Sequence, residues 1–135
     1  VWGFYDPIIS KWRIAGGSGG GSVAVQGSTG SPVSVVAANG ITSSQISTSE
    51  LNQVIFVQGS VPGTECVVSA GTYIAAHTIV GATLEIHGAS STAPVTFEGG
   101  TVFGIAIKGL RQLNQYSVLK LTWNGNLWQE VSWSE

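Results

Sequence analysis

Acidic residues are the first candidates for chemistry in this sequence, because a pair of carboxyl groups can serve as general acid and general base. The chain has seven acidic residues, and Asp6 is its only aspartate. A glycosidase-type pair needs two carboxyl groups roughly 5–10 Å apart. Glu85 and Glu98 lie in predicted strands that could be neighbours. Carboxylates placed this way on strands usually face solvent, so we predict no catalytic residue among them.

Metal and nucleophile chemistry has equally little to build on. Zinc needs three or four ligands, and only Cys66, His77, Glu85 and His87 could supply them. The two histidines are ten positions apart, without a close-spaced ligand motif. The single cysteine, Cys66, is expected to be a small buried hydrophobe. The glycine-rich tract that begins at Gly16 lacks a Walker lysine. The sequence therefore predicts neither an enzyme, nor a metal site, nor a cofactor.

Aromatic side chains are the one binding feature. Tyrosine and tryptophan rings can stack on the apolar C–H faces of sugars. We name Tyr73, Tyr116 and Trp133 as candidate surface aromatics for such binding. The alternative for these rings is packing in the core or in an interface between subunits.

The composition favours an all-β protein with few charges. Hydrophobic residues make up 43% of the 135 residues but charged residues only 9%, and there are 19 glycines. The net charge of −2 and scattered basic residues argue against nucleic acid, and no apolar run is long enough for membrane insertion. Because a low-charge surface promotes association, we expect part of it to be buried in a homo-oligomer, with a trimer preferred.

The chain divides into three predicted regions: a β-hairpin at 1–15, a Gly/Ser-rich linker at 16–31 and a β-sandwich domain at 32–135. The hairpin turns at Asp6-Pro7. The linker resembles both engineered and natural fibre linkers. A helical turn is expected at Ser47–Gln53. The domain strands are expected at Val33–Ala37, Gln53–Gly59, Glu65–Ser69, Thr72–Ala76, Ala82–His87, Pro94–Glu98, Val102–Ile107, Ser117–Trp123 and Leu127–Trp133.

The last two of these strands form the clearest predicted hairpin. They alternate in polarity and are separated by Asn124-Gly125, a strong hairpin signal. Simple alternation places Trp128 and Trp133 on opposite faces of the second strand. Residues 1–15 also read as a tryptophan-bearing hairpin, which raises the hypothesis of a preceding similar domain. The predicted fold is a small antiparallel β-sandwich, jelly-roll-like, that follows a hairpin and a linker.

The segment from Ile79 onward resembles a β module of bacteriophage virion proteins. The resemblance lies in T-L-E-I-H at Thr83–His87, P-V-T-F at Pro94–Phe97, the glycine-rich Gly99–Gly104, and above all S-V-L-K-L-T-W-N-G-N-L-W-Q-E-V-S at Ser117–Ser132. It covers about half of the chain, and only the closing motif is moderately specific. Such modules occur in tail fibres, tailspikes and head-decoration proteins, usually as trimers.

The resemblance implies a structural virion protein on an extracellular particle. We expect a segment of a trimeric tail fibre or tailspike involved in host attachment. Its partners would be other virion proteins and a host-surface glycan or protein. A capsid decoration or head-fibre protein is the first alternative, and a separate carbohydrate-binding module is the second. No β-helix repeat is present in the sequence, so the resemblance does not extend to tailspike depolymerases.

Overall fold

The computed structural model describes residues 3–6, 11–14, 23–69, 72–102 and 104–135, and gives side chains for 23–69, 72–100 and 104–135. The described residues are all-β and contain no helix, as the composition predicts. None of them forms a helix long and apolar enough to cross a bilayer.

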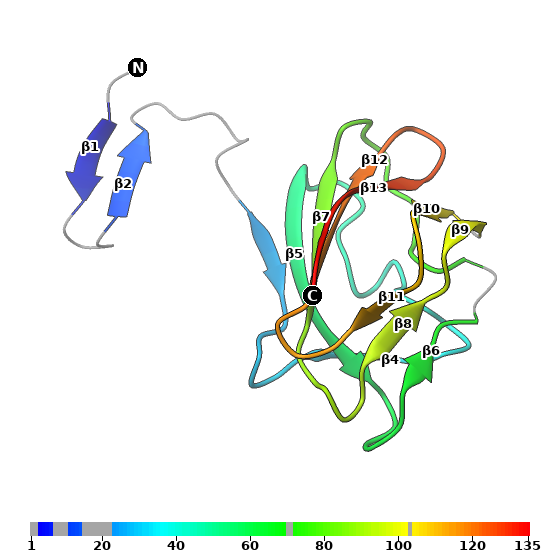
Figure 1. The fold of residues 1–135 in the computed structure, drawn as a ribbon. Coiled ribbons are helices and arrows are strands. Elements are labelled where there is room, and N and C mark those ends of the chain that lie inside the picture. Colours follow the sequence, from blue (N-terminus) through cyan, green and yellow to red (C-terminus); the bar gives the residue numbers. More distant parts are fainter. Residues whose placement is uncertain (1–2, 7–10, 15–22, 70–71, 103) are drawn as a thin grey trace.

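An eight-stranded sheet forms the larger layer (Figure 1). Its main path runs β3-β5-β7-β12-β13-β10-β9, and β4 pairs with the same edge of β5 beyond β3. In chain order these strands are β3 (Ala24–Gln26), β4 (Val33–Val35), β5 (Asn52–Gly59), β7 (Thr83–Gly88), β9 (Gly100–Val102), β10 (Ile105–Ile107), β12 (Val118–Trp123) and β13 (Trp128–Ser134).

A three-stranded sheet, in the order β11-β8-β6, forms the smaller layer. Its strands are β6 (Cys66–Val67), β8 (Val95–Phe97) and β11 (Arg111–Leu113). Both sheets contribute to one hydrophobic core, with Leu84 and Leu119 from the large sheet and Phe97 and Leu113 from the small one. In β5, β7 and β12, buried and half-buried residues alternate strictly, because every second side chain enters this core.

The predicted antiparallel arrangement is wrong for several strands, because the sheets are mixed. β5 runs parallel to β3, β4 and β7, and β13 runs parallel to β10. In the small sheet, β6 runs parallel to β8. Parallel neighbours need long connections, and these are residues 36–51 between β4 and β5, 60–82 between β5 and β7, and 108–127 between β10 and β13. Among the described strands, the antiparallel pairs are β7–β12, β12–β13, β9–β10, β8–β11 and β1–β2.

A β-bulge in the C-terminal hairpin corrects the predicted orientation of its tryptophans. Trp123 pairs with Trp128, but the register shifts so that Lys120 pairs with Ser132 and Leu121 with Glu130. Val131 is the extra residue. Because the bulge adds one position, Trp128 and Trp133 lie on the same face rather than on opposite faces. Trp133 pairs with the buried Leu119 and packs against the core.

Several predicted elements differ in extent. Thr72–Ala76 is not a strand, and makes only an isolated bridge between Ile74 and Ile41. The strand predicted at Val102–Ile107 is two strands, β9 and β10, with Gly104 at a φ of 83° in the turn between them. β11 was not predicted. β3 lies inside the segment predicted as linker. The burial of its side chains alternates, with Ala24 and Gln26 half-buried and Val25 exposed.

The predicted helical turn at Ser47–Gln53 is also wrong. The Gln53 side chain is buried, and its amide accepts a bond from the backbone nitrogen of Ser47 (2.7 Å) and donates one to the Ser47 carbonyl (2.6 Å). The Ser47 hydroxyl accepts bonds from the backbone nitrogens of Ser49 and Glu50. These local side-chain bonds replace the backbone bonds that a helix would need.

The N-terminal residues form a separate two-stranded sheet, β1 (Gly3–Asp6) and β2 (Lys11–Ile14). The strands are antiparallel, with Gly3 opposite Ile14 and Asp6 opposite Lys11. The predicted turn at Asp6-Pro7 extends into residues 7–10, outside the described residues, as do residues 16–22 of the predicted linker.

Candidate functional site

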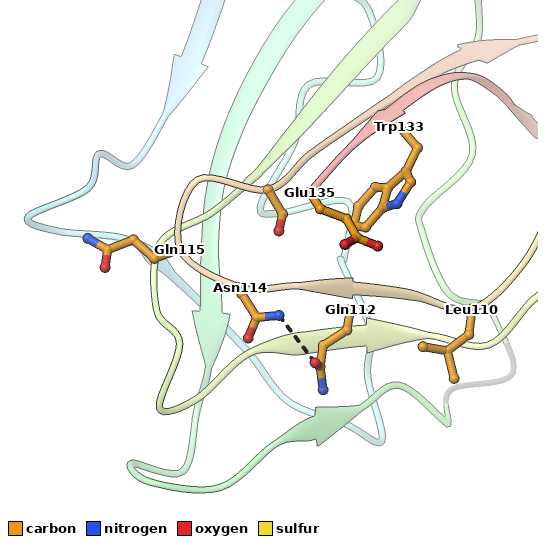
Figure 2. Close-up of a pocket in the computed structure, with 7 residues that line it drawn as sticks. Leu110, Gln112, Asn114, Gln115, Trp133 and Glu135 are labelled. Carbon is orange, nitrogen blue, oxygen red and sulfur yellow. Dashed lines mark hydrogen bonds between the residues drawn. The ribbon is translucent and has the colours of Figure 1, made fainter.

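A groove of about 330 Å³ lies where the end of β13 faces β11 (Figure 2). Trp133 and Glu135 stand on one side of it, and Leu110, Gln112 and Asn114 on the other. Gln115 and Ser117, from the loop between β11 and β12, complete its lining. The groove therefore combines one large aromatic ring, three amide side chains and one carboxylate, and no basic side chain.

The bulge at Val131 is what places Trp133 in the groove. Without the extra residue, Trp133 would point to the opposite face of the large sheet. The Arg111 guanidinium lies 5.3 Å from the centroid of the Trp133 ring, in a cation–π contact that restrains the ring. β13 and β11 thus position the aromatic wall together, although they belong to different sheets.

Arg111 is itself held by Glu130. Its Nε and Nη2 donate bonds of 2.8 and 2.9 Å to the two carboxylate oxygens of Glu130, in a bidentate pair. The two side chains are only 17% and 6% exposed. The hydrogen bond from Arg111 lowers the pKa of Glu130 against the opposing effect of burial, and the same bond raises the pKa of Arg111. Arg111 therefore serves this pair and the tryptophan, and its charge is neutralised by Glu130.

A chain of amides fixes the opposite wall. Asn114 Nδ2 donates to Gln112 Oε1 (3.2 Å), and Gln112 Nε2 donates to Glu65 Oε2 (2.8 Å). Hydrogen bonds from Thr96 and Gln112 lower the pKa of Glu65. Since Glu65 accepts from Gln112, the orientation of both amides is set. Each amide group keeps further donor or acceptor capacity for a ligand.

The loop between β11 and β12 is held in an uncommon backbone conformation. Tyr116 has a φ of 74° and is the one non-glycine residue with positive φ in the described part of the chain. Its backbone nitrogen donates to the Gly88 carbonyl (3.2 Å), and Gly88 nitrogen donates to the Ser117 carbonyl (2.8 Å). Tyr116 is 76% exposed. β7 therefore anchors a left-handed turn that borders the groove and contains an exposed tyrosine.

The three predicted surface aromatics have different environments. Trp133 lines the groove, and Tyr116 lies between two groove-lining residues in sequence. Tyr73 is not a surface residue: it is 3% exposed, and its ring lies 5.8 Å from that of Phe97. It is buried because the segment after residue 72 crosses the core as an irregular chain rather than as a half-exposed strand.

The other chemistry-bearing residues are dispersed. His77 is buried; Ile79 nitrogen donates to its Nδ1 (2.9 Å), so Nε2 carries the proton and donates to the Glu50 carbonyl (2.8 Å). His87 Nε2 lies 3.2 Å from Glu85 Oε1 on the outer face of β7.

Glu85 and Glu98 are not on neighbouring strands, because β7 pairs with β5 and β12 whereas β8 pairs with β11 and β6. Among the described residues no group of three potential metal ligands occurs.

Sequence reasoning missed the amides of the groove. Gln112, Asn114 and Gln115 were not considered, although three amide residues within Gln112–Gln115 beside a tyrosine are a visible signal. Their approach to Trp133 was not predictable, because it depends on the bulge and on the unpredicted strand β11.

The Arg111–Glu130 pair gives a pH-dependent prediction. Because the pKa of Glu130 is lowered in the folded state, the pair stabilises the protein above the ordinary carboxyl pKa of 4.5, and this contribution is lost as the pH falls through the lowered value. Glu130→Gln should reduce the free energy of unfolding by about 1.5–3 kcal/mol at neutral pH. The difference from the parent protein should shrink in acid. Urea unfolding across pH measures it.

The exposed Glu50 supplies the control for this prediction. Glu50→Gln should change stability by less than about 0.5 kcal/mol at every pH. An equal loss for both variants, or a Glu130→Gln deficit that does not vary with pH, would contradict the assigned pair.

No protein-family model, no curated protein and no solved structure matches this chain.

Proposed function

We propose that the chain is a non-catalytic adhesion module of a bacteriophage virion, a segment of a trimeric tail fibre or tailspike that contacts the host surface. The groove between β11 and β13 carries the adhesion part of this proposal. Its aromatic wall and amide-rich opposite wall suit reversible binding of a polar surface molecule.

The virion part of the proposal rests on the sequence motif at Ser117–Ser132 and on the low charge of the chain. The motif covers β12 and most of β13 and ends one residue before Trp133, so the most specific part of the resemblance lies in the hairpin that carries this groove residue. As a segment of a fibre, the domain would be exposed on the surface of the virion, which is an extracellular particle.

Exposed apolar residues support self-association. β3 is an edge strand of the described sheet, and its Val25 side chain is 60% exposed. Val131, at the bulge, is exposed as well. Apolar edge strands are normally covered, because they offer backbone and side chains for pairing. A trimer would bury part of this surface.

Light scattering and a cell-binding assay test the proposal together. The purified full chain should behave as a trimer, and a fluorescent derivative should label bacterial cells in a panel of species. A monomer would contradict the trimeric fibre. Binding to expanded phage capsids without binding to any cell would favour the capsid decoration alternative and refute attachment. Cell binding by a monomer would favour a separate carbohydrate-binding module.

A further inference from the structure

We infer that the groove between β11 and β13 binds an uncharged glycan, with one sugar ring against Trp133 and the adjoining part of the glycan against Tyr116. This inference rests on the proposed adhesion function and adds the class of ligand. It follows from three features of the described residues: the aromatic rings, the hydrogen-bonding groups and the charges.

The aromatic feature is the restrained Trp133 ring. Sugars present a face of C–H groups that packs against an aromatic ring, and a fixed ring binds better than a mobile one because less side-chain entropy is lost. Arg111 contacts the ring, and Glu130 holds Arg111 through two hydrogen bonds.

Tyr116 is the second aromatic feature. Non-glycine residues with positive φ cost of order 1–3 kcal/mol and occur preferentially at ligand sites. Tyr116 combines such a backbone with the largest exposed fraction among the apolar and aromatic side chains given for the described residues. Its neighbours Gln115 and Ser117 line the groove, so Tyr116 belongs to a loop that borders the groove.

The hydrogen-bonding feature is the amide wall. Gln112 and Asn114 offer donors and acceptors that are oriented by the chain of bonds ending at Glu65, whereas the Gln115 amide points away from Trp133 (Figure 2). Neutral amides match hydroxyl and acetamido groups, which both donate and accept. The volume of about 330 Å³ is at the lower end of the range of roughly 300–1,000 Å³ for small-molecule sites, which suits one or two sugar rings.

The charges determine which glycans fit. The lining contains one carboxylate, Glu135, and no basic side chain. Arg111, which contacts the Trp133 ring, is engaged bidentately by Glu130. An acidic sugar would bring its own carboxylate beside Glu135 without a free cation to pair with it, a like-charge contact that costs binding energy. The groove should therefore select neutral over acidic glycans.

Titration calorimetry with the full chain tests the inference. The probes are neutral trisaccharides of glucose, galactose, mannose and N-acetylglucosamine, with trigalacturonic acid as the acidic counterpart. At least one neutral probe should bind with a dissociation constant of about 1 mM or tighter, and the acidic probe at least tenfold more weakly. Preferential binding of the acidic probe, or of no neutral probe, would overturn the inference.

Variants locate the binding. Tyr116→Asn removes the ring but keeps a residue that tolerates positive φ, and should weaken binding at least fivefold without loss of stability. Asn114→Ala should have a similar effect, whereas Asn126→Ala, in the exposed β12–β13 turn, should have none. Trp133→Leu keeps apolar bulk against the core and should abolish measurable binding, with folding verified by circular dichroism. Unchanged binding in all groove variants would place the glycan elsewhere.

The cell-binding assay separates this inference from the proposed function. Cells labelled equally by the parent protein and by Tyr116→Asn, with no glycan bound, would retain the adhesion module and refute the glycan groove. Loss of labelling in Tyr116→Asn and Asn114→Ala, but not in Asn126→Ala, would support both.

Discussion

Replacing Trp128 with alanine is expected to lower the free energy of unfolding by about 3–5 kcal/mol, the largest stability effect that we predict for a side chain. Trp128 is 0% exposed and begins β13. Its indole Nε1 donates to the Ala75 carbonyl (2.8 Å), and its ring makes edge contacts with His77 and Trp123 at 5.8 and 5.4 Å. Truncation would open a cavity and leave a carbonyl unpaired.

Two further variants separate these contributions. Trp128→Phe retains a ring but removes the donor, and should cost less than the alanine variant but more than about 1 kcal/mol. Gln129→Ala, at the exposed next position, should change stability by less than about 0.5 kcal/mol. Urea unfolding followed by circular dichroism measures all three. Equal stability of Trp128→Ala and Gln129→Ala would show that Trp128 is not central to the core.

Replacing Gly88 with alanine is expected to cost about 3 kcal/mol and to displace the loop that lines the groove. A Cβ atom on Gly88 would lie 1.9 Å from the Asn114 carbonyl oxygen and 2.8 Å from the Leu113 carbonyl carbon. These are backbone atoms, which cannot rotate away as a flexible side chain could. The loop would have to move from β7, and the bonds of Gly88 with Tyr116 and Ser117 would be lost.

Gly30 provides the matched control for this substitution. A Cβ at Gly30 meets nothing within 4 Å, and its backbone needs no positive φ. Gly30→Ala should therefore leave stability within about 0.5 kcal/mol of the parent protein. Amide NMR shifts should change at 113–117 in Gly88→Ala and should not change there in Gly30→Ala. An unperturbed loop in Gly88→Ala would refute the close packing of β7 against this loop.

Local patterns predicted the strands that bury every second residue. β5, β7 and β12 were predicted to within one or two residues, because their alternation is long and regular. Short strands were harder: Arg111-Gln112-Leu113 has no alternating pattern of its own, and becomes β11 only by pairing with β8. The parallel pairs of β5 join segments far apart in sequence, and no local signal specifies them.

The candidate site was predictable only in part. Trp133 and Tyr116 could be nominated from residue type, whereas Tyr73 was misplaced because its burial depends on tertiary packing against Phe97. The face on which Trp133 lies depends on one extra residue, Val131, and strict alternation gave the opposite answer. The groove could not be predicted because it depends on this bulge and on β11, which has no local sequence signal.

The position of β13 within the sheet has a consequence for how the protein is made. β13 follows the other strands of the large sheet in the chain, yet it lies between β12 and β10, so this sheet is completed by an interior strand. Until residues 128–134 have left the ribosome, β9 and β10 have no strand to join them to the rest of the large sheet. During that interval, the edges of β12 and β10 that later pair with β13 have unpaired backbone groups, which could associate with other chains. Assembly of the sheet is therefore expected to follow translation of this segment rather than to accompany it.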